Sequence, residues 1–490
     1  MSRWLTVGPF NRVEGDLEVR LEVSAGCVVS ARISSSLYRG FEHVLIGRHP
    51  LDALVIVPRI CGICSVSQSS AAAAALADAA GLEMPANGRL ASNLILGCEN
   101  LADHLTHFYL FFMPDFARAA YRGRAWHGAA ERRFKATVGD ALREVLPARA
   151  DLLRLMGYLA GKWPHSLALQ PGGTTRAVTA TERLRLLSVL RDFRGFLSRV
   201  VFGDSLENVG AIDSGDGLRA WARGRAADFA RFVEIAADLG LDSVGRASDR
   251  FLSYGAYPAA AGGSDAAAGH LFARGVWRGG CRPLVDKLIS EDVSHAWLVG
   301  EQPLHPSAGE TRPLTGEFAD KAAAYTWCKA PRYDGGVAET GALARQVVAG
   351  QPLLRALVAA NGGSVLARVS ARLLELALVV PAMERWVGAL RPGEAFCAQA
   401  QLPDAGSAVG LVEAARGALG HWLRIEHGRI AGYQIIAPTT WNFSPRDAAG
   451  VPGAVEQALA GLPVADGDEV PLLVQHVVRS FDPCMVCTVH

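Results

Sequence analysis

Two pairs of cysteines with the same spacing lie near opposite ends of this chain. The stretch "RICGIC" contains Cys61 and Cys64, and "DPCMVC" contains Cys484 and Cys487. Two C-x-x-C pairs can supply four thiolates to one soft metal centre. A structural zinc site is the simplest alternative, but zinc modules usually keep both pairs close together in the sequence. A thioredoxin-like redox pair would explain either motif alone and not both. We therefore expect a buried catalytic metal centre.

The composition is typical of a globular protein with a large core. Half of the 490 residues are apolar, and 49 basic side chains nearly balance 48 acidic ones. This balance argues against a nucleic-acid-binding surface. Apolar runs are too short to span a membrane; Arg368 and Arg372, for example, interrupt the stretch 364–380. No apolar signal segment is found at the start, and nine cysteines are too few for a disulfide scaffold. We expect a soluble, cytoplasmic protein.

The hydrophobic patterns predict a predominantly helical α+β protein in which the two ends of the chain meet. Alternating apolar residues from Leu17 to Val23 predict a β-hairpin, and 421–437 predicts a second one that turns at His427 and Gly428. Long helices are expected near 131–160, 180–202, 216–238, 363–389 and 470–480. We expect one unit over 1–490, made of an N-terminal hairpin (about 4–36), a helical body (67–240), an irregular α/β insert (240–360) and a C-terminal metal-binding region (363–490).

The cysteine motifs and the stretches between them resemble the large subunit of nickel–iron hydrogenases, from about residue 6 to residue 490. The shared stretches, in order, are "RVEGDLEV" at 12–19, "YRGFE" at 38–42, "DHLTHFY" at 103–109, "KAPRYDG" at 329–335, "ARGALGHW" at 415–422 and "PTTWNFSPRD" at 438–447. The fold of that family, a mainly helical body with small sheets, agrees with the predicted elements.

The resemblance implies a nickel–iron centre whose iron carries carbon monoxide and cyanide, and which splits dihydrogen heterolytically into protons and electrons. Cys61 and Cys484 would bind nickel alone, while Cys64 and Cys487 would bridge nickel and iron. Soft sulfur ligands suit a redox-active nickel ion.

Further positions match residues that surround this centre in the family. Arg416 and Thr439 match the hydrogen-bond donors to cyanide, and Glu14 matches the acid that relays protons outward. The carboxylates that hold Arg416 in place would be Asp103 and Asp482. A magnesium ion near the end of the chain would be bound by Glu42, the backbone carbonyl of Ile435, and His490.

Three positions resemble the regulatory, hydrogen-sensing subgroup. Gln68 stands where most members have a histidine that donates to the bridging sulfur, here Cys487; a glutamine can donate but cannot titrate. Ile63 and Phe111 match the inner end of the gas tunnel, where bulky side chains would admit hydrogen more readily than oxygen. We predict a hydrogen sensor. An energy-conserving uptake hydrogenase, a non-catalytic scaffold related to respiratory complex I, and a structural zinc protein are the alternatives.

The mechanism also implies partners. The remaining cysteines show no spacing typical of an iron–sulfur cluster, which needs about four of them; they are Cys27, Cys98, Cys281, Cys328 and Cys397. Electrons are therefore expected to leave through a partner subunit that holds the iron–sulfur clusters. Maturation proteins and a signalling kinase are further expected partners.

Overall fold

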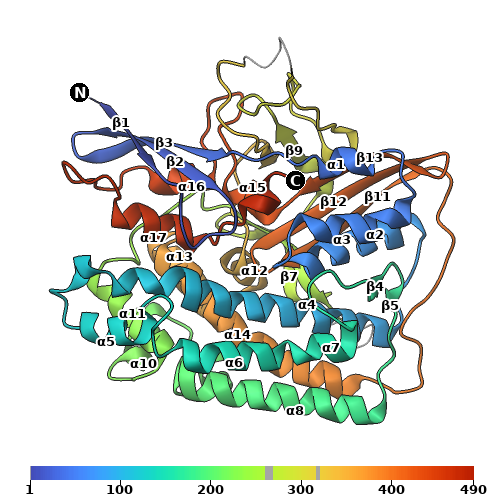
Figure 1. The fold of residues 1–490 in the computed structure, drawn as a ribbon, viewed down its shortest axis with the longest axis horizontal. Helices are drawn as coiled ribbons and strands as arrows, with labels where there is room; N and C mark the ends of the chain where they lie inside the picture. The colour runs from blue at the N-terminus through green and yellow to red at the C-terminus, as the bar shows by residue number, and fades with distance from the viewer. Residues whose placement is uncertain (1, 260–268, 316–320) are drawn as a thin grey trace.

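The structure is a computed structural model that describes residues 2–259, 269–315 and 321–490. Long helices form the lower part of the molecule in Figure 1, and small sheets from both ends of the chain lie above them. Among the described residues, no helix is both long and apolar enough to cross a membrane.

The N-terminal sheet has three antiparallel strands, β1 (Arg3–Val7), β2 (Leu17–Ser24) and β3 (Cys27–Ser35), in the order β1-β2-β3. Leu17, Val19 and Leu21 are buried and alternate with exposed residues, which is why β2 and β3 form the predicted hairpin. The prediction missed β1, which pairs along β2.

The helical body is built around α4 (Ala86–Thr106) and α14 (Val365–Ala389), which pack against each other. Both are buried on almost every side, as is typical of helices in the centre of a large protein. The other long helix, α8 (Ala180–Phe196), packs on α14 and continues into a π-helical turn, η6 (Leu197–Phe202). A second such turn, η3 (His107–Phe112), continues α4.

Two of the predicted long helices are interrupted. The stretch 131–160 contains α5 (His127–Phe134), α6 (Leu142–Leu152) and α7 (Arg154–Ala160), because residues 135–141 form a turn in which the amide of Gly139 bonds to Lys135. The stretch 216–238 contains α10 (Gly215–Ala222) and α11 (Asp228–Asp238), separated where Gly224 adopts a positive φ of 69°. Hydrophobic periodicity continues across both breaks, so it could not reveal them.

The C-terminal sheet positions the metal-binding region. Its strands are β11 (Gly406–Ala414), β12 (Gly417–Glu426) and β13 (Arg429–Ile436), and the β12–β13 hairpin turns at His427 and Gly428 as predicted. Strand β11, which was not predicted, packs closely on α3 (Ser65–Ala79). A Cβ atom at Gly410 would lie 2.0 Å from the carbonyl oxygen of Ala71, so only glycine allows this approach.

The remaining elements connect these layers. The helices are α1 (Phe41–Leu45), α2 (Ala53–Ile56), α9 (Leu206–Gly210), α12 (Ala342–Ala349), α13 (Pro352–Asn361), α15 (Pro438–Asn442), α16 (Ala454–Leu459), α17 (Leu472–Ser480) and α18 (Met485–Thr488). The short 3-10 turns are η1 (Pro50–Asp52), η2 (Val57–Ile60), η4 (Met113–Ala117), η5 (Ala119–Tyr121), η7 (Asp286–Leu288) and η8 (Pro306–Ala308). The strands are β4 (Leu169–Gln170), β5 (Gly173–Thr174), β6 (Phe251–Pro258), β7 (His270–Trp277), β8 (Cys281–Arg282), β9 (Ile289–Asp292) and β10 (Ala330–Tyr333).

Candidate metal centre

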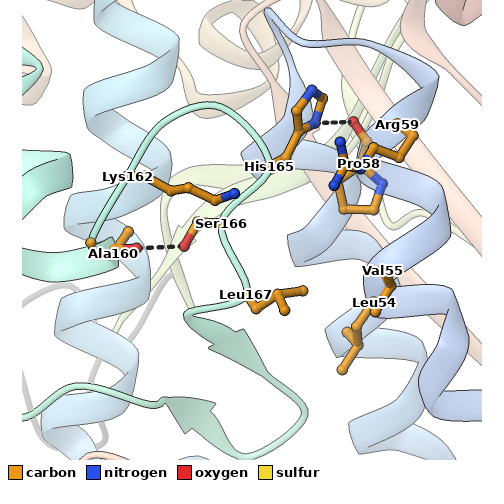
Figure 2. A pocket seen from close by; sticks show the side chains of 10 residues that line it. Leu54, Val55, Pro58, Arg59, Ala160, Lys162, His165, Ser166 and Leu167 are labelled. Atoms are coloured by element: carbon orange, nitrogen blue, oxygen red, sulfur yellow. Dashed lines mark hydrogen bonds between the residues drawn. The ribbon is translucent and has the colours of Figure 1, made fainter.

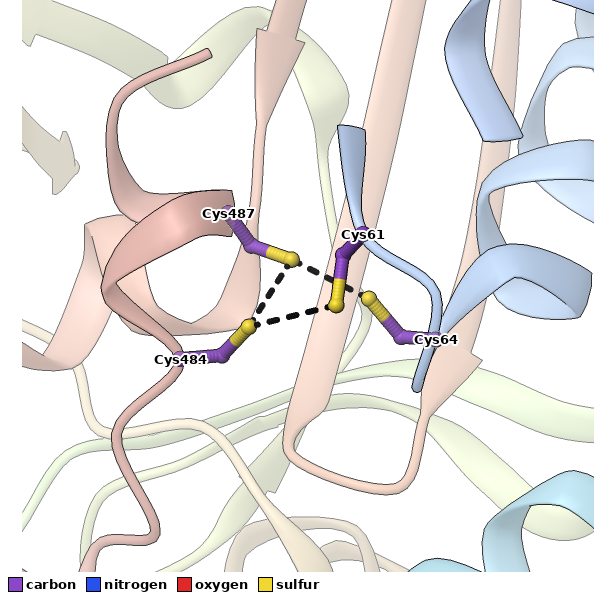
Figure 3. Close-up of side chains that lie close together, drawn as sticks. All are labelled: Cys61, Cys64, Cys484 and Cys487. Atoms are coloured by element: carbon purple, nitrogen blue, oxygen red, sulfur yellow. Dashed lines mark hydrogen bonds between the residues drawn. The ribbon is translucent and has the colours of Figure 1, made fainter. Parts of the chain in front are cut away.

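The four motif cysteines converge in one buried cluster, although they come from opposite ends of the chain (Figure 3). Their Sγ atoms all lie within 4.8 Å of one another. The separations are 3.0 Å for Cys64 and Cys487, 3.1 Å for Cys484 and Cys487, and 3.6 Å for Cys61 and Cys484. All four are free thiols. Four convergent sulfurs are a donor set for a soft metal.

Each motif turns tightly into a helix, which brings its two thiols to the same side. Cys61 follows the 3-10 turn η2, and Cys64 directly precedes α3. Cys484 directly precedes α18, and Cys487 lies within it. The segment around Glu14 runs beside Cys484: the amide of Met485 donates to the carbonyl of Glu14 at 2.7 Å, and the amide of Glu14 donates to Pro483 at 3.4 Å. The N-terminal segment thus supports the C-terminal motif.

The four crowded thiols have pKa values that shift in opposite directions. Hydrogen bonds from Cys484 and from the other thiols lower the pKa of Cys61 well below its ordinary value. Hydrogen bonds with Cys484 and Cys61 raise the pKa of Cys64 and Cys487, because a thiol that donates to a neighbouring thiolate must keep its proton. A cation in the cluster would remove this conflict, because it stabilises every thiolate at once.

Arg416 lies beside the sulfurs at the turn between β11 and β12 and is held by two buried carboxylates. Its Nη1 is 2.8 Å from Asp103, and its Nη2 is 3.2 Å from both Asp103 and Asp482. Burial raises the pKa of Asp103 to about 7, although the guanidinium of Arg416 acts in the opposite direction. The structure therefore brings together the three residues that were expected to form this group.

Arg345 is a member of the site region that the sequence did not reveal. It is fully buried on α12 and forms ion pairs with Glu375 and Glu413. It also donates to the carbonyls of Ala414 and Ala415 at 3.0 and 3.2 Å, directly before Arg416. A signal was available, since Glu375 is a charged residue inside the apolar helix 363–389.

Glu14 and Thr439 both lie next to Cys484. The hydroxyl oxygen of Thr439 accepts from the amide of Cys484 at 3.1 Å, which leaves the hydroxyl proton free to donate elsewhere. Glu14 is half-buried, and its carboxyl group lies in the field of Cys61. Burial raises the pKa of Glu14, and the charge of Cys61 adds to this effect.

Gln68 lies in a buried hydrogen-bonded row that includes two residues not singled out from the sequence. Its Oε1 is 2.9 Å from Nε2 of His421, and Nδ1 of His421 is 2.8 Å from the hydroxyl of Tyr433. Burial lowers the pKa of His421 to about 3, so this histidine is neutral and can donate through only one ring nitrogen. Since Oε1 of Gln68 can only accept, Nε2 of His421 donates and Tyr433 donates to Nδ1.

Two of the expected magnesium ligands, Glu42 and His490, lie together, and Glu42 also bonds to the backbone of Ile435. Oε1 of Glu42 accepts from the amide of Ile435 at 2.7 Å and lies 3.3 Å from Nε2 of His490. The buried ammonium of Lys329 lies 3.3 Å from Glu42 and 3.1 Å from Glu291, two contacts that the sequence did not predict. Burial opposes the charge of Glu42, but Lys329 and a hydrogen bond from His490 outweigh it and lower its pKa to about 2.

One buried oxygen in this second cluster fits a cation. Oε2 of Glu42 has no hydrogen-bond partner among the described residues. Buried carboxylate oxygens are normally paired, and hard cations such as magnesium prefer them as ligands.

Ile63 and Phe111, the expected tunnel residues, lie in different environments. Ile63 is half-buried and packs against the hydrophobic cluster that contains Cys61 and Cys64. Phe111 is half-buried in η3, and its carbonyl accepts from Arg12 at 3.0 Å. A gas tunnel that ends at Ile63 and Phe111 remains a prediction.

The chain matches a family model described as nickel-dependent hydrogenase over residues 39–125 and 228–490. The chain belongs to this family. It is 32% identical to the periplasmic NiFeSe hydrogenase large subunit of Desulfomicrobium baculatum, over 99% of this chain and 94% of the relative. It is 28% identical to the uptake hydrogenase large subunit of Azotobacter chroococcum mcd 1, over 100% of this chain and 95% of the relative. A solved NiFeSe hydrogenase structure from Dm. baculatum superposes with a TM-score of 0.85 at 30% identity, and each chain is covered over 100% of its length.

These matches confirm the predicted α+β fold class and show that this hydrogenase large subunit is an oxidoreductase that acts on dihydrogen. The four buried thiols fit the nickel on which the family depends, because thiolates are ligands of choice for soft transition metals. Sulfur geometry alone would also suit zinc, so the family match decides the metal.

Proposed function

We propose that this chain cleaves dihydrogen at a nickel–iron centre held by the four cysteines, as the input stage of a hydrogen sensor. The observation that carries the reaction is the convergence of four buried sulfurs beside a guanidinium that is fixed by two carboxylates. The observation that favours sensing is Gln68, whose amide cannot titrate and is held by His421.

The four cysteines would bind the two metals of the centre in two different ways. Cys61 and Cys484 would bind nickel, and Cys64 and Cys487 would bridge it to iron. All four ligands are cysteines, so we propose that every ligand atom at these positions is sulfur. The relative from Desulfomicrobium, by contrast, is named a NiFeSe hydrogenase. When bound, the centre would supply the heterolytic cleavage of dihydrogen.

Arg416 and Thr439 would orient the iron ligands. Both side chains lie next to the sulfurs, and both carry protons that can be donated to cyanide. Apolar neighbours exclude water from the pocket, and donors in a dry pocket act more strongly than donors in water.

Glu14 would accept the proton at its carboxyl group and pass it outward. A carboxyl group whose pKa is raised by burial is better matched to proton transfer near neutral pH than an ordinary glutamate. Its position beside Cys484 and its half-buried state support a role between the centre and solvent.

A magnesium ion bound by Glu42, His490 and the carbonyl of Ile435 would pin the end of the chain against β13. The unpartnered Oε2 of Glu42 supports this proposal. Lys329 and Glu291 would then lie in the surrounding shell and balance its charge.

Electrons would leave through a partner subunit that contains iron–sulfur clusters. The relatives are named large subunits, which supports a second, smaller subunit. Within the described ranges, the only group of convergent cysteines is the one at the metal centre. Maturation proteins would load the metals, and a signalling kinase would read the output.

An uptake hydrogenase is the second candidate, and the names of the relatives favour it. A sensor that controls gene expression would act in the cytoplasm, whereas the Desulfomicrobium relative is named periplasmic. Three measurements separate the candidates: hydrogen oxidation with dyes in cell extract, cell fractionation, and hydrogenase gene expression after deletion of this chain. Slow turnover in the cytoplasm and loss of hydrogen-dependent expression support sensing. Rapid turnover with unchanged expression supports uptake.

A further inference from the structure

Glu99, a fully buried carboxylate on α4, lies under the first turn of α3 and is not part of the machinery described above. We infer that Glu99 is a positioning residue that fixes the Cys61–Cys64 turn and thereby places two of the four metal-binding sulfurs. This inference rests on the proposed metal site and goes beyond it, since it assigns a role to a residue whose hydrogen bonds reach none of the four motif cysteines.

The two oxygens of Glu99 accept from three consecutive residues directly after Cys64. Oε1 accepts from the amide and hydroxyl of Ser67 at 2.9 and 3.0 Å. Oε2 accepts from the amide of Val66 at 2.8 Å and from the hydroxyl of Ser65 at 3.5 Å. The indole of Trp163 also donates to Oε2, at 3.0 Å.

These bonds replace a missing helix cap. The first amides of a helix have no partner within it, and a Ser, Thr, Asp or Asn at the N-cap usually accepts from the second or third of them. The N-cap of α3 is Cys64, whose side chain makes no capping bond. Glu99 accepts from the amides of the second and third residues, Val66 and Ser67, and thus caps α3 from another helix, α4. Cys64 is thereby free to direct its sulfur toward the cluster.

The loop that contains His165 contacts the same turn on both sides, and Figure 2 shows one of these contacts, the bond between His165 and Pro58. The ring of His165 donates through Nδ1 to the carbonyl of Pro58 at 3.0 Å, ahead of Cys61. The amide of His165 donates to the hydroxyl of Ser65 at 3.2 Å, after Cys64. Because Trp163 in this loop also bonds to Glu99, the turn is held between α4 and the loop.

Position 99 requires a carboxylate. Five donors face its two oxygens, and an ionised carboxylate offers only acceptors. An amide at this position would turn one NH2 group toward the amide of Ser67 or that of Val66.

The chain contains a matched control. Glu456 is equally buried and accepts from the amide of Ile33, the hydroxyl of Tyr325 and the amide of Gly453, at 3.0, 2.8 and 3.4 Å. Burial raises the pKa of both Glu99 and Glu456 to about 7. Glu456 joins β3 to α16, and none of its hydrogen-bond partners belongs to either cysteine motif. The effect of losing a buried carboxylate can therefore be distinguished from the effect of losing the cap of α3.

The test compares Glu99→Leu and Glu99→Gln with Glu456→Leu and Glu456→Gln in the full chain purified with its partner. Nickel release to excess EDTA is measured first. Loss of a residue that orients a metal ligand typically weakens metal binding about 10- to 100-fold, so we expect nickel to leave Glu99→Leu faster by about this factor. Glu99→Gln keeps one acceptor oxygen and should fall between wild type and Glu99→Leu. Both Glu456 variants should release nickel at the wild-type rate.

The second readout is independent of nickel. The metal-free full chain is treated with iodoacetamide under native conditions, and mass spectrometry measures alkylation of each motif cysteine. Relative to the wild-type chain, the Glu99 variants should gain more alkylation at Cys61 and Cys64 than at Cys484 and Cys487. An equal gain at both motifs, or nickel release no faster than in the Glu456 variants, would overturn the inference. If Glu99→Leu does not fold, Glu99→Gln alone decides. A wild-type chain that contains no nickel refutes the proposed function instead, and the alkylation ratio still tests Glu99.

Discussion

Replacing Arg416 with methionine should destabilise the protein in a way that depends on pH. The guanidinium is the cation between Asp103 and Asp482, and the three side chains are at most 4% exposed. Removing one partner of a buried ion pair typically costs about 3–5 kcal/mol, because the remaining charge stays buried without compensation. At about 2.1 cal/mol/K per residue, the unfolding entropy of 490 residues is roughly 1 kcal/mol/K, so the midpoint of thermal unfolding should fall by about 3–5 °C.

The pH dependence follows from Asp103. Burial raises the pKa of Asp103 to about 7 from an ordinary 3.8, and loss of the guanidinium raises it further. Below this pH, Asp103 is protonated and needs no cation. The loss of stability in Arg416→Met should therefore be larger at pH 8 than at pH 6. Arg416→Lys keeps the charge, but a single ammonium cannot bond to both carboxylates as the planar guanidinium does. The stability of Arg416→Lys should therefore lie between that of wild type and that of Arg416→Met.

Scanning calorimetry of the purified complex at both pH values measures these differences. The control is Arg391→Met, which removes an exposed pair with Glu394 in which Arg391 is 76% exposed. Exposed pairs contribute little, so its midpoint should stay near that of wild type. An equal shift in Arg416→Met and Arg391→Met at pH 8, or a loss that grows as the pH falls, would refute the reasoning.

Three further predictions concern single positions. Glu14→Gln should slow dye-linked hydrogen oxidation by about 10²- to 10⁴-fold, since a positioned acid–base group typically contributes that much; unchanged turnover would place the proton relay elsewhere. Gln68→His introduces a titratable ring beside His421, and hydrogen-dependent gene expression should be lost, whereas unchanged signalling would remove Gln68 as a marker of sensing. Burial raises the pKa of Glu456 to about 7 from 4.5, so its contribution to stability is present below pH 4.5 and is lost as the pH rises through 7, by roughly 3 kcal/mol at most. Glu456→Gln should therefore flatten the pH dependence of the unfolding midpoint between pH 5 and 8, and an unchanged slope would contradict the raised pKa.

Local patterns predicted those parts of the fold that depend on neighbouring residues. The alternation in β2, the turn at His427 and Gly428, and the long apolar face of α14 all depend on short-range periodicity. Strands β1 and β11 were missed because each is stabilised mainly by a neighbour and carries little pattern of its own. The breaks near 135–141 and at Gly224 interrupt stretches that remain helical in composition.

The candidate site was predictable where a motif carried it and not where it depended on contacts across the fold. The four cysteines have a recognisable spacing, and the structure brings their sulfurs together. Arg345, Lys329 and His421 reach the site from elements distant in sequence, and their roles become clear only from their contacts in the structure. Lys329 and His421 do lie inside the stretches "KAPRYDG" and "ARGALGHW", so the sequence contained a signal whose physical reason required the structure.

Metal analysis of the purified complex, combined with its infrared spectrum, tests the central claim most directly. If the four converging sulfurs hold a nickel–iron centre, nickel and iron will be present in equal amounts at this site, and the spectrum will contain bands of metal-bound carbon monoxide and cyanide. Zinc without nickel and iron, together with a spectrum that lacks these bands, would contradict the account.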